Sequence, residues 1–156
     1  MKILRPAVTA GLLLFVAASI ARPIVRQMAA GGHETAGDAA PQRPDGLVVY
    51  YFRSNVRCTA CRRLEACSRE VVSERFPAAF ADGRIEWRAI DYQQPGNEHF
   101  TTDFQLLTGG VVLVAFRDGY PDRWKALMEA WNMTGDRTAL ARYLEEAIDA
   151  FQKEGS

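Results

Sequence analysis

The feature that most restricts the fold of this chain is a cysteine pair, Cys58 and Cys61, between an apolar segment and an amphipathic one. Residues 47–52 form a β-branched and aromatic run, which is typical of a central strand covered on both faces. A polar loop over residues 53–57 leads from this run to Cys58. Over residues 59–76, apolar side chains recur at intervals of three and four, which predicts a helix. The pair therefore lies at a strand-to-helix junction.

The middle of the chain predicts one more strand and one more helix. Residues 84–91 alternate between apolar and polar side chains, as a strand with one wetter face does. A helix is expected from Asn97, as its N-cap, to Leu107. Phe100, Phe104 and Leu107 are spaced by four and three and are expected to form its apolar face.

The remaining segments predict a hairpin and a C-terminal helix. The apolar run 111–116 reads as a second buried strand, and Asp118-Gly119 is a strong hairpin signal. The hairpin partner is expected to pass into a helical turn within residues 123–131. A last helix is expected over 136–152, capped by Asp136. This order predicts an α/β fold: a mixed central sheet of about four strands with helices on both faces.

The N-terminal residues 1–26 are predicted to be a signal-anchor or a signal peptide. Basic residues near Met1 precede an uncharged, mostly apolar run over 6–21, which is short for a membrane-spanning helix. The small residues that end this run are followed by Arg22-Pro23, an awkward context for cleavage, so an uncleaved anchor is slightly favoured. We expect the protein to be membrane-anchored or exported, with the domain on the extracytoplasmic (periplasmic) side.

A flexible linker is predicted over residues 27–46, which are rich in Ala, Gly and Pro and lack a helical or strand period. The folded domain is expected over residues 47–154. Lysine plus arginine equals aspartate plus glutamate at 19 each, so no net field attracts nucleic acid.

The position of the cysteine pair predicts redox chemistry. Cys58 would meet unpaired N–H groups and the positive end of the helix dipole, and Arg57, Arg62 and Arg63 add positive charge. These features favour a thiolate, so Cys58 is the expected nucleophile in thiol–disulfide exchange with a redox partner protein. Cys61, one helical turn later, would resolve the mixed disulfide.

Two alternatives remain open for the pair: a binding module for soft metals or metalloids that uses the same thiolates, and an inert structural disulfide. A closed zinc site needs four ligands, whereas His33 lies in the linker and His99 on a different helix. We therefore assign no resident metal and no cofactor. Cys67 falls on the apolar stripe of its helix and is expected to be a core thiol.

Residues 47–151 resemble the thioredoxin superfamily in element order and spacing. Residues 48–52 and the pair within 58–61 look like its redox strand and active-site helix. Residues 111–116, followed by 118–119, look like its central hairpin. The resemblance implies a thioredoxin-like fold and a redox-active disulfide.

A narrower resemblance is to the nitrophenyl compound nitroreductase subunit ArsF family. It is carried by residues 50–52, 55–62, 99–100, 111–114 and 123–125. These are small thioredoxin-like proteins with an N-terminal hydrophobic segment, and their name implies a subunit of a larger redox system. The chain has no flavin or nicotinamide motif, so the resemblance implies that a partner supplies any such cofactor. It leaves open whether the chain is a thiol–disulfide oxidoreductase or a non-catalytic subunit of a redox complex.

The chain departs from ordinary thioredoxins at three places. Arg57 precedes the pair where they carry tryptophan, and Thr59 and Ala60 stand in place of Gly-Pro. Tyr51 holds the place of a buried aspartate that assists proton transfer, and Val111 replaces the cis-proline that shapes their substrate groove. These departures favour a specialised partner or a soft metal ion over general disulfide reduction.

Overall fold

The computed structural model describes residues 44–155 of the 156-residue chain. The predicted signal or anchor over 1–26, and the predicted linker up to residue 43, lie outside these residues. Between residues 44 and 155, no helix combines the length and the apolar character that crossing a membrane requires.

Four strands form one mixed sheet: β1 (Gly46–Arg53), β2 (Ile85–Asp91), β3 (Gly110–Arg117) and β4 (Tyr120–Ala126). Their order across the sheet is β2-β1-β3-β4. β1 runs parallel to β2 and antiparallel to β3, and β3 runs antiparallel to β4. β1 is therefore a central strand, which agrees with its unbroken run of apolar residues.

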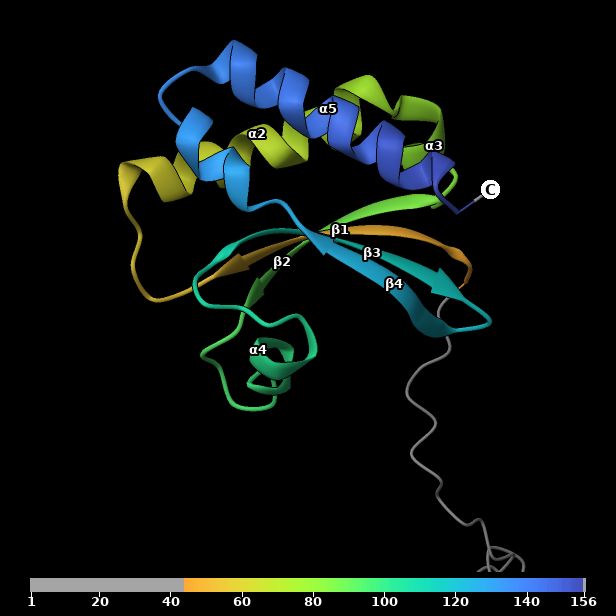
Figure 1. Ribbon diagram of the computed structural model, residues 1–156, viewed down its shortest axis with the longest axis horizontal. Coiled ribbons are helices and arrows are strands. Elements are labelled where there is room, and N and C mark those ends of the chain that lie inside the picture. Colours follow the sequence, from red (N-terminus) through yellow and green to blue (C-terminus); the bar gives the residue numbers. More distant parts are fainter. Residues whose placement is uncertain (1–43, 156) are drawn as a thin grey trace, which may run out of the picture. The chain divides into compact units, whose positions relative to one another are not determined.

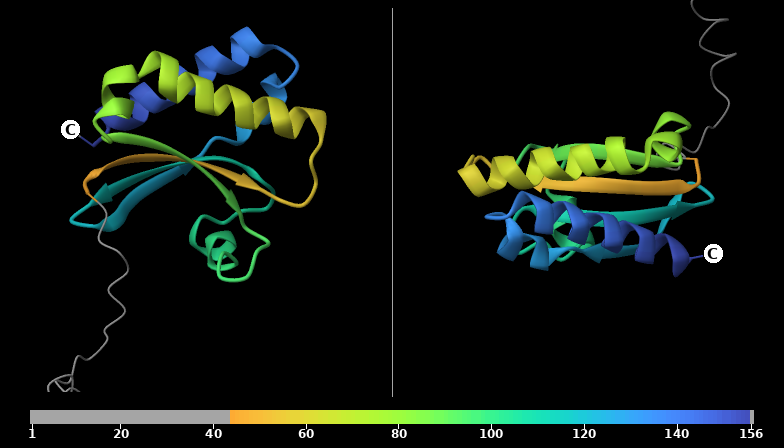
Figure 2. Two further views of the ribbon diagram at one scale, coloured as in Figure 1. Left: turned by 180° about the vertical axis from the view of Figure 1, so that it is seen from behind. Right: turned by 90° about the horizontal axis from the view of Figure 1, so that it is seen from above.

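Helices cover both faces of this sheet (Figure 1). The two long helices, α2 (Thr59–Arg75) and α5 (Arg137–Lys153), pack side by side on one face (Figure 2). The short helix α3 (Pro77–Ala81) and the 3-10 helix η1 (Met128–Met133) lie on the same side. α4 (His99–Asp103) lies on the opposite side. The predicted α/β class, with a mixed sheet of four strands, is confirmed.

Two apolar clusters, one on each face of the sheet, fill the core. Successive residues of β1 point to opposite faces, as the pleat of a strand requires. Leu47, Val49 and Tyr51 join the cluster beneath α2 and α5. Val48, Tyr50 and Phe52 join the cluster that contacts α4. β1 therefore supplies side chains to both apolar clusters. Its buried position also fixes where the loop to Cys58 begins.

The helix predicted over residues 97–107 is wrong in length. α4 spans only five residues, and its N-cap position is Glu98 and not Asn97, whose Nδ2 donates to the Asp91 carbonyl oxygen at 2.9 Å. Gln105 adopts a left-handed φ of 50°, which ends helical geometry. The Leu107 side chain is consequently 96% exposed and does not extend the apolar face.

The predictions for the last third of the chain are confirmed. The hairpin turn holds Asp118 and Gly119 at φ of 53° and 86°, the left-handed geometry that such a turn requires. β4 passes directly into η1. Asp136 caps α5 by accepting hydrogen bonds from the N–H groups of Thr138 and Ala139, at 2.9 and 3.0 Å.

Candidate functional site

Cys58 and Cys61 form a disulfide at the start of α2, with their Cα atoms 5.0 Å apart. Cys58 is the N-cap residue: its Sγ accepts a hydrogen bond from the Cys61 N–H at 3.0 Å. Its carbonyl oxygen accepts the first helical hydrogen bond, from the Arg62 N–H, also at 3.0 Å. A sulfur atom thus takes the place that an oxygen of Ser, Thr, Asp or Asn usually fills. The helix offers Cys58 an N–H donor and the positive end of its dipole.

The two cysteines differ in exposure. Cys58 is exposed, whereas Cys61 is half-buried. A sulfur atom of another molecule can therefore approach Cys58 more easily than Cys61. The sequence predicted that these two residues act together, and the structure brings them into covalent contact.

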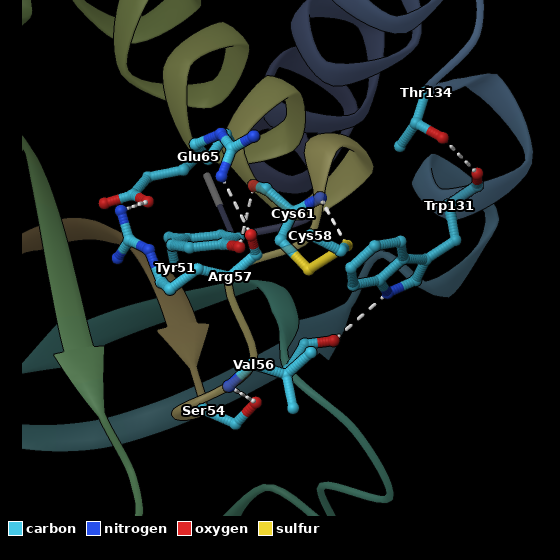
Figure 3. The surroundings of a disulfide bond; sticks show 11 residues. Tyr51, Ser54, Val56, Arg57, Cys58, Cys61, Glu65, Trp131 and Thr134 are labelled. Carbon is cyan, nitrogen blue, oxygen red and sulfur yellow. Dashed lines mark hydrogen bonds and ion pairs between the residues drawn. A yellow bond between two sulfur atoms is a disulfide. The ribbon is translucent and has the colours of Figure 1, made fainter.

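Tyr51, in β1, hydrogen-bonds to the backbone of the cysteine pair. Its hydroxyl donates to the Cys61 carbonyl oxygen at 2.9 Å, and the residue is only 2% exposed (Figure 3). Burial, reinforced by the negative charge of Glu65, raises the pKa of Tyr51 to about 12, although Arg57 and Arg53 oppose this shift. Tyr51 therefore stays protonated at neutral pH and cannot accept a proton from a cysteine there.

An ion pair secures the loop that precedes Cys58. The Arg57 guanidinium lies 3.2 Å from the Glu65 carboxylate, one turn beyond Cys61 on α2. The Arg62 Nη1 also donates to the Arg57 carbonyl oxygen, at 2.9 Å. On the other side of the loop, the Asn55 N–H donates to Gln93 Oε1 at 2.8 Å. These contacts connect the loop before Cys58 to α2 and to the segment after β2.

Trp131, in η1, is drawn among the residues that surround the disulfide in Figure 3. Its Nε1 donates to the Gly109 carbonyl oxygen at 3.1 Å. A Cβ at Gly109 would lie 2.6 Å from the Phe52 carbonyl oxygen, and one at Gly110 would lie 3.3 Å from Trp131 Nε1. Glycine at these two positions therefore lets the chain pass close to β1 and η1 where it enters β3. The adjacent Gly109 and Gly110 are the local sequence sign of this close approach.

Val111 follows these glycines at the start of β3, where it pairs with Tyr51 of β1. It is 1% exposed, and its carbonyl oxygen accepts a hydrogen bond from the Leu127 N–H at 2.8 Å. All peptide bonds of the described residues are trans. This position, which the resemblance matched to a cis-proline, is thus an ordinary buried strand residue.

Cys67 is a free thiol in the core, 4% exposed, as its place on the apolar stripe predicted. Burial raises its pKa, with a further contribution from Glu70 that Arg137 opposes. His99 lies on α4 and forms a 2.7 Å pair with Asp103. Within residues 44–155, no cluster of three or more His, Cys, Asp or Glu side chains could hold a metal ion.

The strand order, the strand directions and the helices on both faces define a thioredoxin-like α/β fold. Its disulfide opens the first long helix after the central strand. Among solved structures, thioredoxin f2 of Chlamydomonas reinhardtii is similar to this chain, with 11% sequence identity and a TM-score of 0.34. The match covers 64% of this chain and 84% of the other. No family model matches the chain, and no curated protein matches it.

Proposed function

We propose that this protein carries out thiol–disulfide exchange with a partner protein, with Cys58 as the nucleophile and Cys61 as the resolving thiol. One observation carries the proposal: an exposed cysteine at the N-cap of α2 is disulfide-bonded to a half-buried cysteine one turn later. In this arrangement a partner can reach Cys58, while Cys61 lies close enough to attack a mixed disulfide formed there.

The proposed reaction begins with the pair reduced. The Cys58 thiolate attacks one sulfur of a partner disulfide, so that an intermolecular S–S bond forms and the partner's other sulfur leaves as a thiolate. The Cys61 thiolate then attacks Cys58 Sγ, which forms the Cys58–Cys61 disulfide and releases the partner's second thiolate. Two electrons pass from the pair to the partner, and the same steps in reverse oxidise a partner dithiol.

The surroundings of Cys58 support its role as the attacking group. The Cys61 N–H donates to its sulfur, and the helix N-terminus stabilises negative charge there. The arginines on either side of the pair add positive charge, although Glu65 balances that of Arg57. Because the thiolate is the reactive form of cysteine, each of these contributions raises the reactive fraction of Cys58.

Trapping of the intermediate tests the proposal. The reduced Cys61→Ser variant, incubated with a protein extract and analysed by mass spectrometry, should retain partners as mixed disulfides through Cys58. Cys58→Ser is the matched control and should retain far fewer. Retention of arsenite or a soft metal by the reduced wild type, with no partner trapped by either variant, would mean that the thiolates are ligands instead. A pair that no cellular reductant opens would be a structural crosslink.

We also propose that the protein is tethered to the membrane on its extracytoplasmic side and is a subunit of an arsenic-linked nitroreductase system. The basic and apolar pattern of residues 1–26 supports the tether, and the resemblance to the ArsF family supports the system. Fractionation of cells that express the full chain, with the intact mass of the recovered protein, tests the tether. Recovery of the full-length mass from membranes is expected, whereas a shortened soluble form would mean that the segment is cleaved.

A further inference from the structure

We propose that the surface around the disulfide docks a partner protein whose reactive disulfide is flanked by acidic residues. We name this surface the disulfide rim and define it as Val56, Arg57, Cys58, Arg62 and Arg63. The inference rests on the proposed function, because it describes the substrate of that same site.

The three arginines of the disulfide rim stand directly beside the cysteines. Arg57 precedes Cys58, and its side chain is 45% exposed. Arg62 and Arg63 follow Cys61, and both are exposed. The hydrogen bonds of their guanidinium groups point them in different directions. Arg62 reaches the Arg57 carbonyl oxygen, whereas Arg63 approaches the Thr134 carbonyl oxygen at 3.4 Å. Positive charge therefore extends from the loop before Cys58 to the turn before α5.

Acidic residues balance this charge only in part. Glu65 pairs with Arg57 at 3.2 Å. Neither Arg62 nor Arg63 has a carboxylate within ion-pair distance among residues 44–155. The whole chain has a formal net charge of zero, so the excess at the disulfide rim is local. A local positive field beside a reactive atom increases the encounter rate of negatively charged partners.

An exposed apolar residue favours a protein segment over a small anion as the occupant. Val56, on the loop that leads to Cys58, is 67% exposed. Figure 3 draws it among the residues around the disulfide. An apolar side chain next to an arginine matches a polypeptide that presents an apolar residue beside a carboxylate. The partner disulfide should therefore lie in an acidic segment with at least one apolar side chain.

Synthetic peptides test this inference. Three peptides would each hold one internal disulfide and differ only in the flanking residues: glutamate, serine or lysine. The reduced full chain, in a neutral detergent, would be mixed with each peptide in a stopped-flow instrument. At low salt, the glutamate peptide should react about tenfold faster than the lysine peptide, since electrostatic steering changes rates by about 10- to 1,000-fold. The ratio should fall to about twofold near 0.5 M salt, because screening removes charge attraction beyond a few ångströms.

Charge reversal provides the matched comparison. The double variant Arg62→Glu with Arg63→Glu should reverse the peptide preference. The control, Arg69→Glu with Arg142→Glu, changes two exposed arginines outside the disulfide rim and should keep it. Equal rates for the three peptides, or an unchanged preference after reversal at the disulfide rim, would overturn the inference.

A neutral reagent separates this inference from the proposed function. 4,4′-Dithiodipyridine carries no charge, so its reaction with the pair does not depend on the arginines as docking groups. Release of two thiopyridone molecules with formation of the Cys58–Cys61 disulfide shows that the pair exchanges. Exchange with this reagent but no preference for the acidic peptide refutes the docking surface alone. A pair that forms no disulfide with the reagent refutes the proposed function and, with it, the inference.

Discussion

Replacement of Tyr51 by phenylalanine removes one hydroxyl that hydrogen-bonds to the first turn of α2. That hydroxyl donates to the Cys61 carbonyl oxygen at 2.9 Å from a side chain that is 2% exposed. A hydrogen bond of this kind contributes about 1 kcal/mol net to the free energy of unfolding. At neutral pH, the Tyr51→Phe variant should therefore be less stable than the wild type by about 1 kcal/mol.

Raising the pH should erase this difference. The pKa of Tyr51 is about 12 in the folded protein, against about 10 for an unperturbed tyrosine. A group whose folded pKa is raised contributes stability that is fully present below the unfolded value and is lost as the pH rises toward the folded value. Each pH unit within that window removes roughly 1 kcal/mol from the wild type, so the whole window removes about 2 to 3 kcal/mol. The two proteins should have equal stability near pH 11, and the variant should be the more stable one above that.

Urea unfolding of the oxidised proteins, followed by tryptophan fluorescence, measures both effects. The titrations would be run at pH 7, 9 and 11 on the wild type and on Tyr51→Phe. Tyr120→Phe is the matched control, because it removes a hydroxyl from a residue that is 58% exposed, and it should match the wild type at every pH. A stability difference between the wild type and Tyr51→Phe that stays constant from pH 7 to pH 11 would refute the assigned role of Tyr51.

Three further substitutions test packing, capping and close approach. Cys67→Ser places a hydroxyl in the core and should lower the free energy of unfolding by about 1 to 3 kcal/mol in urea titrations; exchange should continue, and its loss would show that Cys67 takes part. Asp136→Ala removes two N-cap hydrogen bonds of α5 and should lower the free energy of unfolding by about 1 kcal/mol. Asp136→Ser should restore most of this stability, and equal losses in the two variants would contradict the capping role. Gly109→Ala would bring a Cβ within 2.6 Å of the Phe52 carbonyl oxygen, so it should lower the thermal midpoint and slow exchange; an unchanged midpoint would show that the loop relaxes freely.

Local patterns were sufficient to predict most of the fold. Residues 47–52 are almost all apolar, so both faces of this strand must be covered, which predicts a central strand. The structure confirms that β1 is central and that residues 47–52 are buried. The turn at Asp118-Gly119 and the cap at Asp136 were predicted because their geometry depends on the residues themselves. Joining such elements into one sheet with buried faces predicts the α/β class, whereas the strand order β2-β1-β3-β4 comes from the folded structure.

The segment between β2 and β3 was predicted less well, because its conformation depends on distant contacts. Phe100 and Phe104 pack against Tyr50 and Phe52 of β1, so the tertiary contact holds these two rings. Leu107 continues the same spacing but has no partner surface, and its side chain is almost fully exposed. The three- and four-residue spacing of apolar side chains could not show which of them are buried in the folded protein and which are exposed.

The position of the cysteine pair was predicted from the sequence, but the contacts that support it were not. The spacing of Cys58 and Cys61, together with the strand before them, was enough to expect a bonded pair at a helix start. The contacts around the pair join residues that are not neighbours in the sequence. Tyr51 reaches Cys61 across 10 positions, and Trp131 reaches Gly109 across 22. No local period encodes such contacts, so only the folded chain reveals them.

The order in which the three thiols react tests the central claim most directly. The reduced protein would be exposed to a limiting amount of iodoacetamide at pH 6.5, quenched after increasing times, and mapped by peptide mass spectrometry. Cys58 is expected to be alkylated more than about tenfold faster than Cys61, because it is the exposed thiol at the helix N-terminus, and Cys67 should stay unlabelled while the protein is folded. Labelling of Cys61 before Cys58, or equal rates for the two, would contradict the account.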